Sequence, residues 1–353
     1  MRINYIIYLL LSCFFFSCKG KIEVGCLPIT SIDLSGADTL LLEQVSTEGY
    51  LLSYPEAMIL LNGQLVIQDK KGQSSLFHAI DVKDGQISEF VFRGNGPEEY
   101  LDVNLNPFVC GNNMVGFYDG IKRKVFFWEQ INNQFRFFQN VDFNCKNEWI
   151  REAVCCGDYF LLTGENGRFS KSRFLIADNV GNVVSQSGKY PFISSSSFVN
   201  SQDDMRRLLY SSSFWRISPD KQKAIFASYH GSLCQFFDLS FLPDSLREIK
   251  SLQLTSPINF SQITKEHAGW VYGFEDVFVT NNYVYLVFNG QTALDNPEFG
   301  HNILVYDWNG SLVKTYVTDL GIRSIAVDEA QGIFYLVGYD GEEMMLYSAL
   351  VDC

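Results

Sequence analysis

The sequence predicts an all-β fold, a six-bladed β-propeller whose ring is closed by an N-terminal strand. Short apolar and aromatic runs recur along the chain, separated by turn signals such as LNGQ, VKDGQ and YDWNGS. No long segment shows sustained helical periodicity, and SQDDMRRLLYSS is the best candidate for one short helix. Many short strands at regular spacing are typical of a sandwich, a barrel or a propeller.

An internal repeat decides between these architectures. Each repeat has a short apolar strand, a polar turn, a second apolar strand and then a third; a fourth strand often follows. Successive repeats begin roughly 45 to 65 residues apart, the size of a four-stranded propeller blade. The first two strands of the six repeats occupy residues 56–72, 106–122, 151–167, 216–232, 275–291 and 323–341.

The remaining strands follow in order. The third strands are expected at residues 75–82, 125–131, 172–181, 233–240, 302–310 and 344–352. Fourth strands are expected at residues 87–92, 135–141, 183–188, 251–254 and 312–317. The sixth repeat ends at Cys353 without one, and either SIDLSG or TLLLEQV near the N-terminus could supply it. Pairing the two chain ends would leave no radial edge between the first and last blades.

The amino-acid composition indicates a folded, acidic protein. The chain has 353 residues, of which 47% are apolar and 19% charged, so most of it is expected to be folded. Aromatic residues make up 15%, which suits strands packed on both faces. The net charge of −13 argues against non-specific binding to nucleic acid or to an anionic membrane surface, because both attract basic patches.

The N-terminus, MRINYIIYLLLSCFFFSCKGK, has the pattern of a bacterial lipoprotein signal. An apolar run of about 12 residues spans roughly 18 Å as a helix, too short for a bilayer core of about 30 Å. The run ends in Ser17-Cys18, and Cys18 would become the acylated first residue. An ordinary signal peptide is the alternative. The expected organisation is a lipoprotein signal peptide at 1–17, an N-terminal tether at 18–35 and the propeller at 36–353.

The other cysteines give no sign of disulfides or of a metal site. Seven remain in the mature chain, an odd number at irregular spacing, with no C-x-x-C pair and no Cys/His grouping. Most are expected to be small core residues, and the adjacent Cys155 and Cys156 should point to opposite faces of a strand. No metal and no cofactor is expected.

The stretch FVFRGNGPEEY is interpreted as a structural corner that leaves the first blade. A phosphate loop would need a helix start and a Lys-Ser/Thr pair, and neither follows. Two carboxylates could form an acid/base pair, but Glu98 and Glu99 are adjacent and should diverge. The reversal favours glycines that tolerate positive φ and a proline that fixes φ. The corner residues are Gly94, Gly96, Pro97, Glu99 and Tyr100.

These features resemble a known family, the TolB-like six-bladed propeller lipoproteins of Bacteroidetes-type bacteria. The resemblance rests on SCKGK, on the G-x-G-P-x-E-Y corner with the blade before it, and on WRISPDKQKAIFAS, similar to the Ser-Pro-Asp-Gly turn of such propellers with Gln222 in place of Gly. It covers most of the mature chain. It implies fold and location, with little defined chemistry.

Propeller ligands commonly sit in an axial funnel near the ends of the innermost strands. Arg151, Arg216 and Arg323 stand at comparable places at three inner strands. Converging guanidiniums and aromatics would suit an anionic or carbohydrate-like small molecule. The alternative is that the arginines form ion pairs between blades. The candidate funnel residues are Arg151, Arg216, Arg323, Trp149, Trp215, Tyr272 and Glu275, with Glu56, Asn106 and Trp270 close by.

Two functions stay open. The first is a lipid-anchored, non-enzymatic binding or scaffolding module of the cell envelope, favoured on the periplasmic face of the outer membrane because KGK after Cys18 lacks an acidic export signal. Its partners would be envelope proteins or the small molecule above. The second is a hydrolase or lyase with its active site in the funnel, since propellers host such enzymes. The four scattered histidines form no triad or metal spacing, so no catalytic residue is identified.

Overall fold

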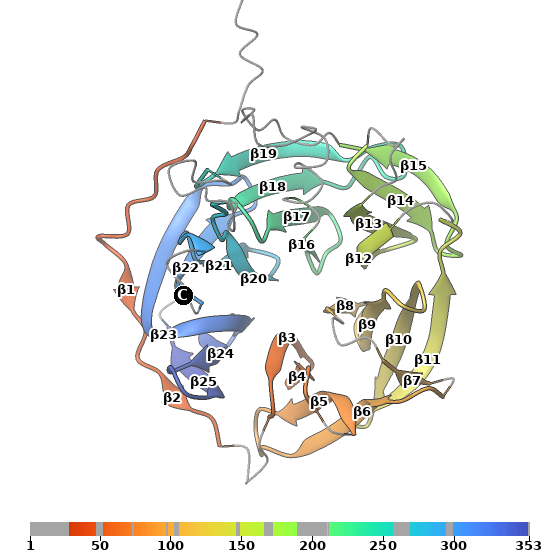
Figure 1. The fold of residues 1–353 in the computed structure, drawn as a ribbon, viewed down its shortest axis with the longest axis horizontal. Helices are drawn as coiled ribbons and strands as arrows, with labels where there is room; N and C mark the ends of the chain where they lie inside the picture. The colour runs from red at the N-terminus through yellow and green to blue at the C-terminus, as the bar shows by residue number, and fades with distance from the viewer. Residues whose placement is uncertain are drawn as a thin grey trace, which may run out of the picture.

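The computed structural model describes residues 28–46, 52–72, 74–96, 98–101, 106–145, 149–165, 172–188, 210, 212–256, 269–293 and 299–351. Every element assigned within these ranges is a β-strand. Figure 1 shows the sheets arranged radially around an axis, with β3, β8, β12, β16 and β20 innermost. The signal peptide, Cys18 and most of the expected short helix at 201–212 lie outside the described residues. Within the described ranges, no helix is long and apolar enough to cross a bilayer.

Four sheets each hold one predicted repeat, and their strands follow chain order from axis to rim. The first comprises β3 (Pro55–Leu61), β4 (Gln64–Asp69), β5 (Ser75–Asp81), β6 (Ile87–Arg93) and β7 (Glu99–Tyr100). The second comprises β8 (Pro107–Cys110), β9 (Met114–Asp119), β10 (Lys124–Ile131) and β11 (Gln134–Asp142). The third comprises β12 (Trp149–Cys156), β13 (Tyr159–Glu165), β14 (Phe174–Asp178) and β15 (Val183–Ser187). The fourth comprises β16 (Ser213–Ile217), β17 (Lys223–Ser228), β18 (Leu233–Asp238) and β19 (Arg247–Gln253).

The last two repeats share one eight-stranded sheet. Its main strands are β20 (Phe274–Val279), β21 (Tyr283–Phe288), β22 (Gly300–Asp307), β23 (Leu312–Asp328), β24 (Ile333–Tyr339) and β25 (Met344–Leu350). The long strand β23 belongs to both repeats. Its first part pairs with β22 from Leu312 to Val317, with one further pair between Ile322 and Gly300, and its second part pairs with β24 from Gly321 onward. One unbroken strand therefore runs from the rim of the fifth repeat to the axis of the sixth.

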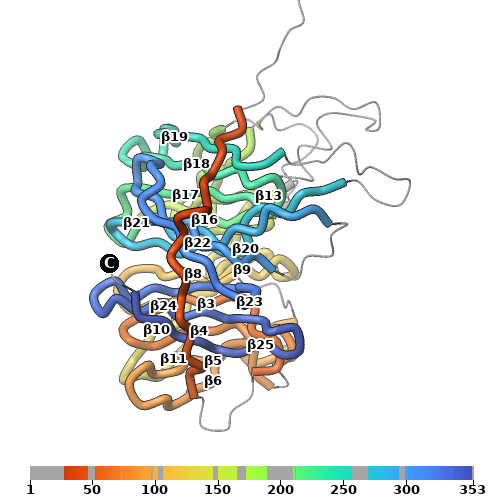
Figure 2. Tube along the Cα trace, turned by 90° about the vertical axis from the view of Figure 1, so that its left-hand side faces the viewer, coloured from red at the N-terminus to blue at the C-terminus, as the bar shows by residue number. Residues whose placement is uncertain are grey.

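The N-terminal segment, residues 29–45, runs along the rim, and we call it the strap (Figure 2). Ile29 forms a β-bridge with Gln253 at the end of β19. Then β1 (Asp38–Thr39) pairs in parallel with β23, and β2 (Glu43–Gln44) pairs antiparallel with β25. Of the two candidate segments, TLLLEQV is thus the one that contacts the last strand of the chain.

The core lies in the seams between successive sheets. Alternating apolar positions on each strand face the neighbouring sheet, and many of the buried side chains are aromatic, from Trp215 on an innermost strand to Phe90 on β6. One seam joins the first sheet to the last: Leu65 and Ile67 of β4 pack with Tyr335 and Val337 of β24. Buried apolar side chains therefore join the first sheet to the last one.

The hairpin between β3 and β4 has the turn that its sequence predicts. Asn62 and Gly63 have φ values of 48° and 77°, the left-handed pair that a two-residue type I′ turn requires. The turn reverses the chain at the end of an innermost strand, so it places Asn62 at the axial opening. The Asn62 amide donates to the carbonyl of Asn112 in the next sheet, at 2.9 Å.

The FVFRGNGPEEY stretch turns out of β6 and returns as β7, which pairs in parallel with it. The φ of Gly94 is 157°, while Gly96 has no positive φ, so the expectation of left-handed backbone at Gly96 does not hold. Both glycines make room for Glu99 instead: a Cβ on Gly94 would lie 2.0 Å from Glu99 Oε2. That oxygen accepts the Gly96 N–H at 2.8 Å. Tyr100 is fully buried, and Pro97 lies outside the described residues.

Candidate functional site

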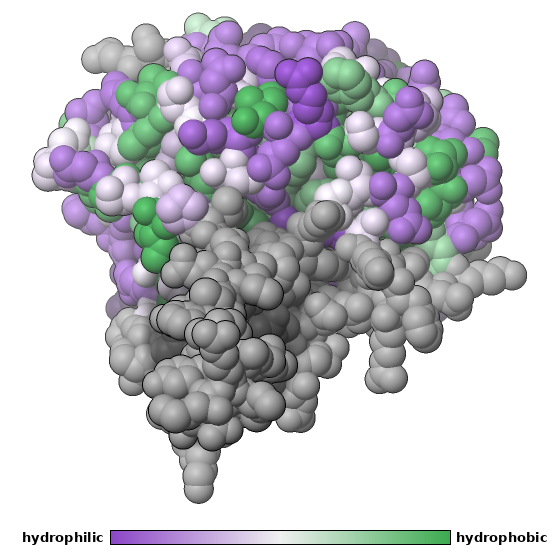
Figure 3. All heavy atoms as spheres, turned by 90° about the horizontal axis from the view of Figure 1, so that it is seen from above, coloured by the Kyte–Doolittle hydropathy of each residue, from purple (hydrophilic) through white to green (hydrophobic). Residues whose placement is uncertain are grey.

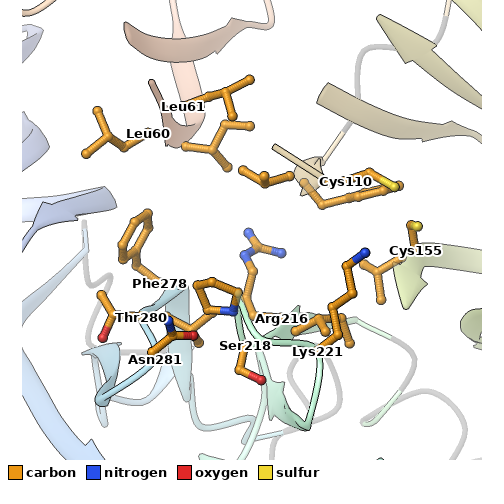
Figure 4. A pocket seen from close by; sticks show the side chains of 18 of the residues that line it. Leu60, Leu61, Cys110, Cys155, Arg216, Ser218, Lys221, Phe278, Thr280 and Asn281 are labelled. Carbon is orange, nitrogen blue, oxygen red and sulfur yellow. The ribbon is translucent and has the colours of Figure 1, made fainter. Parts of the chain in front are cut away.

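A cavity of about 490 Å³ lies on the axis, where the innermost strands end. All six repeats contribute to its wall, because each inner strand turns outward there. Apolar side chains form slightly more than half of the wall, and Figure 4 shows Leu60, Leu61 and Phe278 around the opening. Polar groups form the rest, including Asn62, Ser218, Lys221 and Asn281. A concave cavity that combines apolar walls with polar groups able to orient a ligand is the usual form of a small-molecule site.

Arg216 is one of the charged residues of this cavity, together with Lys221 and Glu329, and Figure 4 shows its guanidinium extending into the open space. It stands on β16 beside Trp215, whose ring is fully buried. The Arg216 side chain is only 8% exposed and forms ion pairs with carboxylates of two other repeats. Its Nη1 lies 3.5 Å from Glu152 Oε1, and its Nη2 lies 3.3 Å from Asp276 Oδ1.

Hydrogen bonds fix the two carboxylates that pair with Arg216. Glu152 Oε2 accepts the N–H of Trp215 at 3.0 Å. Asp276 Oδ2 accepts the N–H of Ile325 at 3.0 Å and the hydroxyl of Ser324. Burial raises the pKa of Glu152 to about 7, although the attraction of Arg216 opposes this. Burial likewise raises the pKa of Asp276.

A smaller pocket of about 130 Å³ lies at the opposite ends of the inner strands. Arg323 lies in its wall and pairs with carboxylates from the first and fifth repeats. Its Nη2 is 2.6 Å from Glu56 Oε1, and its Nη1 is 3.4 Å from Glu275 Oε2. Lys70 also pairs with Glu56, at 3.2 Å. Burial raises the pKa of Glu275, which accepts a hydrogen bond from Asn289 at 2.8 Å.

These groups form a belt of ion pairs around the axis between the two pockets. We call it the ion-pair belt: Glu56, Glu152, Arg216, Glu275, Asp276 and Arg323. Its carboxylates outnumber its guanidiniums, so the positive charge of each arginine is already balanced within the protein. Every pair joins different repeats. The belt therefore ties the blades together at the axis, as the inter-blade alternative expected.

The structure distributes the predicted funnel residues over several places. Arg323 and Glu275 line the smaller pocket together with Glu56 and Asn106. Arg216 and Trp215 line the axial cavity. Arg151 is exposed on β12 and lines neither pocket.

The other predicted aromatic residues do not line either pocket, or have side chains outside the described residues. Tyr272 stacks on His230 at 5.9 Å in a cluster with Trp270 and Tyr229. Burial lowers the pKa of His230 to about 4, so the ring is neutral at pH 7. The side chain of Trp149 lies outside the described residues.

Sequence reasoning did not single out several residues of the site. Glu152 and Asp276 follow Arg151 and Glu275 directly, and in each pair the first residue is skipped by the strand pairing at a β-bulge, which interrupts the regular alternation of side chains. Lys221 lies in the predicted Ser-Pro-Asp turn and reaches the cavity rim beside Cys155 (Figure 4). Within the described ranges, no three His, Cys, Asp or Glu side chains converge as metal ligands.

Radial sheets around an axial cavity define the chain as a β-propeller protein. Residues 37–330 match the family model described as TolB-like 6-blade propeller-like, and the chain belongs to this family. The resemblance seen in the sequence is thus confirmed at the level of the family. No curated protein matches the sequence.

Solved structures of the same fold are similar to the chain at low sequence identity. A "Putative exported protein" from Bacteroides fragilis has a TM-score of 0.53 and 12% identity, over 92% of this chain and 98% of that chain. A luciferin-regenerating enzyme has a TM-score of 0.50 and 9% identity, over 88% of this chain and 95% of that chain. At these identities, the likeness shows the fold alone.

Proposed function

We propose that the chain is a binding propeller that holds a small molecule in the axial cavity. The observation that carries this proposal is the cavity of about 490 Å³, which is lined by apolar side chains of all six repeats and by the guanidinium of Arg216. Because Glu152 and Asp276 already balance Arg216, the site favours an apolar body with a hydrogen-bond acceptor over a strongly charged anion. On the side seen in Figure 3, the described surface mixes hydrophilic and scattered hydrophobic side chains.

Two fluorescent probes test the cavity. The neutral N-phenyl-1-naphthylamine and the anionic 1-anilinonaphthalene-8-sulfonate share one aromatic body and differ in the sulfonate. We expect the neutral probe to bind one site at least as tightly as the anion. Val109 lines the cavity and is 41% exposed, so Val109→Trp can fill space there without overpacking the core. It should weaken the neutral probe by about tenfold or more.

Val313→Trp is the matched control, since Val313 is 52% exposed and lines neither pocket. It should change the affinity by less than about twofold. Equal weakening by both variants, or no saturable binding to the wild type, would refute the small-molecule site and favour a scaffold. An anionic probe that binds about tenfold tighter would favour the anionic or carbohydrate-like ligand at the arginines.

The hydrolase or lyase function stays second, and one observation favours it. Glu152 has a pKa near 7 and lies next to Arg216, so it could hold a proton at neutral pH. Against it, Glu152 lines neither pocket among the described residues, and its oxygens face inward: Oε2 accepts the Trp215 N–H, and Oε1 lies 3.5 Å from Arg216 Nη1 in an ion pair. A positioning role within the ion-pair belt accounts for the same geometry.

We further infer six blades, the last one completed by the strap. The pairing of β2 with β25 supports this, and so does the double use of β23, which leaves four strands for each of the last two repeats. The six-blade description of the family agrees with it. In this arrangement, TLLLEQV supplies the fourth strand of the sixth blade and closes the ring.

We also propose an extracytoplasmic location with a lipid anchor at Cys18, on the periplasmic face of the outer membrane. The N-terminal sequence supports the anchor, and the exported B. fragilis protein of the same fold supports the location. Cys18→Ala should move the protein from the membrane fraction to the soluble fraction and remove the lipid from the mature N-terminus. Membrane retention of this variant, with no lipid found on the wild type, would contradict the anchor.

A further inference from the structure

Two thiols face each other at the rim of the axial cavity. Cys110 ends β8 and Cys155 lies near the end of β12, so they come from neighbouring sheets. Both line the cavity, and Figure 4 shows their side chains directed toward one another. Cys110 is 9% exposed and Cys155 is half-buried, and both are free thiols. Most cysteines were expected to be core residues, and Cys156, next along β12, is buried.

The surroundings make Cys155 the more acidic thiol. A hydrogen bond from the Cys110 thiol, aided by the Lys221 ammonium, holds the pKa of Cys155 below its usual range, while burial and Asp158 act in the opposite direction. The same contact and burial raise the pKa of Cys110. Burial raises the pKa of Cys156 to about 12. The pair therefore has one thiolate-forming member at the cavity rim and one protonated partner behind it, the arrangement of a reactive dithiol.

We propose that Cys110 and Cys155 form a redox-active thiol pair that closes into a disulfide between the second and third sheets. The reaction partner is a disulfide compound, either a small molecule or an oxidised dithiol protein. Disulfides persist in extracytoplasmic compartments, where we place this chain.

The exchange balances in two steps. The Cys155 thiolate attacks one sulfur of the partner disulfide, which forms a mixed disulfide and releases the other sulfur as a thiolate. Cys110 then loses its proton and attacks the Cys155 sulfur, and the second partner thiolate leaves. In total, the two cysteines lose two protons and two electrons, and the partner disulfide is reduced to two thiols.

A closed disulfide would also alter the axial cavity, and this second part rests on the proposed function. The bond would join two wall strands at the rim and remove the thiolate next to Lys221. We expect the affinity for N-phenyl-1-naphthylamine to change by about fivefold or more on oxidation. If the disulfide is mapped but the affinity is unchanged, the thiol pair does not affect ligand binding. The proposed thiol chemistry would still hold.

The direct test oxidises the reduced mature chain with glutathione disulfide and alkylates the remaining thiols with N-ethylmaleimide after unfolding. Peptide mapping by mass spectrometry without reduction should find the Cys110–Cys155 cross-link as the main product. Cys145 and Cys234 should be recovered alkylated, because both are buried. Lys221→Met should slow the cross-linking by about three- to tenfold through loss of thiolate at Cys155.

Cys145→Ser is the matched control and should leave the cross-link intact, while Cys155→Ser should abolish it. Three results would overturn the proposal. The first is glutathione retained on Cys155 while Cys110 is recovered as a free, alkylated thiol. The others are a cross-link between other cysteines, or no reaction of either thiol. Because the readout is a covalent product of the wild-type chain, it does not depend on the folding of any variant or on a ligand.

Discussion

Arg216→Met is expected to lower the free energy of unfolding by about 3–5 kcal/mol, because it leaves buried carboxylates without their counterion. Glu152 and Asp276 are 5% and 2% exposed, and both pair with Arg216. Urea denaturation at pH 8 measures the loss. It should shrink at pH 5, where Glu152 takes up a proton because burial has raised its pKa to about 7, and the raised pKa of Asp276 acts in the same direction.

Arg151→Met is the matched control, the same change at the corresponding strand of the third repeat. Arg151 is exposed, so its replacement should stay within about 0.5 kcal/mol. Equal losses for the two variants would show that the ion-pair belt does not stabilise the ring. An Arg216→Met variant with the same free energy of unfolding as the wild type would mean the same, and would favour a purely ligand-binding role for this arginine.

Leu40→Ala in the strap should lower the free energy of unfolding by about 2–5 kcal/mol, the usual loss for a buried Leu. Leu40 is 7% exposed and packs with Tyr316 and Phe334 of the last two repeats. Its N–H also donates to the carbonyl of Val317 at 2.9 Å, a bond that the substitution keeps. Chemical denaturation followed by tryptophan fluorescence measures the change.

The adjacent Leu41 provides the control, because it is 83% exposed. Leu41→Ala should stay within about 0.5 kcal/mol of the wild type. If Leu40→Ala is as mild as Leu41→Ala, the strap is a loosely held edge, and the inferred closure of the ring by this segment loses its energetic support.

The strands were predictable because each carries its own local signal. Apolar runs bounded by turns such as Asn62-Gly63 fix where a strand ends whatever surrounds it. The strap was harder to assign, since SIDLSG and TLLLEQV are equally strand-like and only tertiary pairing separates them. Likewise β23 contains two predicted strands, and nothing local shows that the chain passes between them unbroken.

The site was predictable only in part, for a physical reason. Equivalent positions in the repeats do converge on the axis, so Glu56, Glu275 and Arg323 lie together. Their partners depend on neighbouring blades, which the sequence of a single repeat does not show. Arg151 stands at the same β-bulge position as Glu56, Glu275 and Arg323, yet its side chain is exposed, while Glu152 next to it is buried beside Arg216.

The strap also constrains how the chain reaches its folded state. Gln44 contacts Met345, 301 residues further along the sequence. During synthesis, the strap emerges first and its partner strand nearly last, so this contact must wait for almost the whole chain. Contacts of such large sequence separation slow folding and leave strand edges exposed in the meantime. Locally paired hairpins can form early, but the contact between the strap and β25 requires the sheets between them to be in place, and a chain that lacks either segment would lose it.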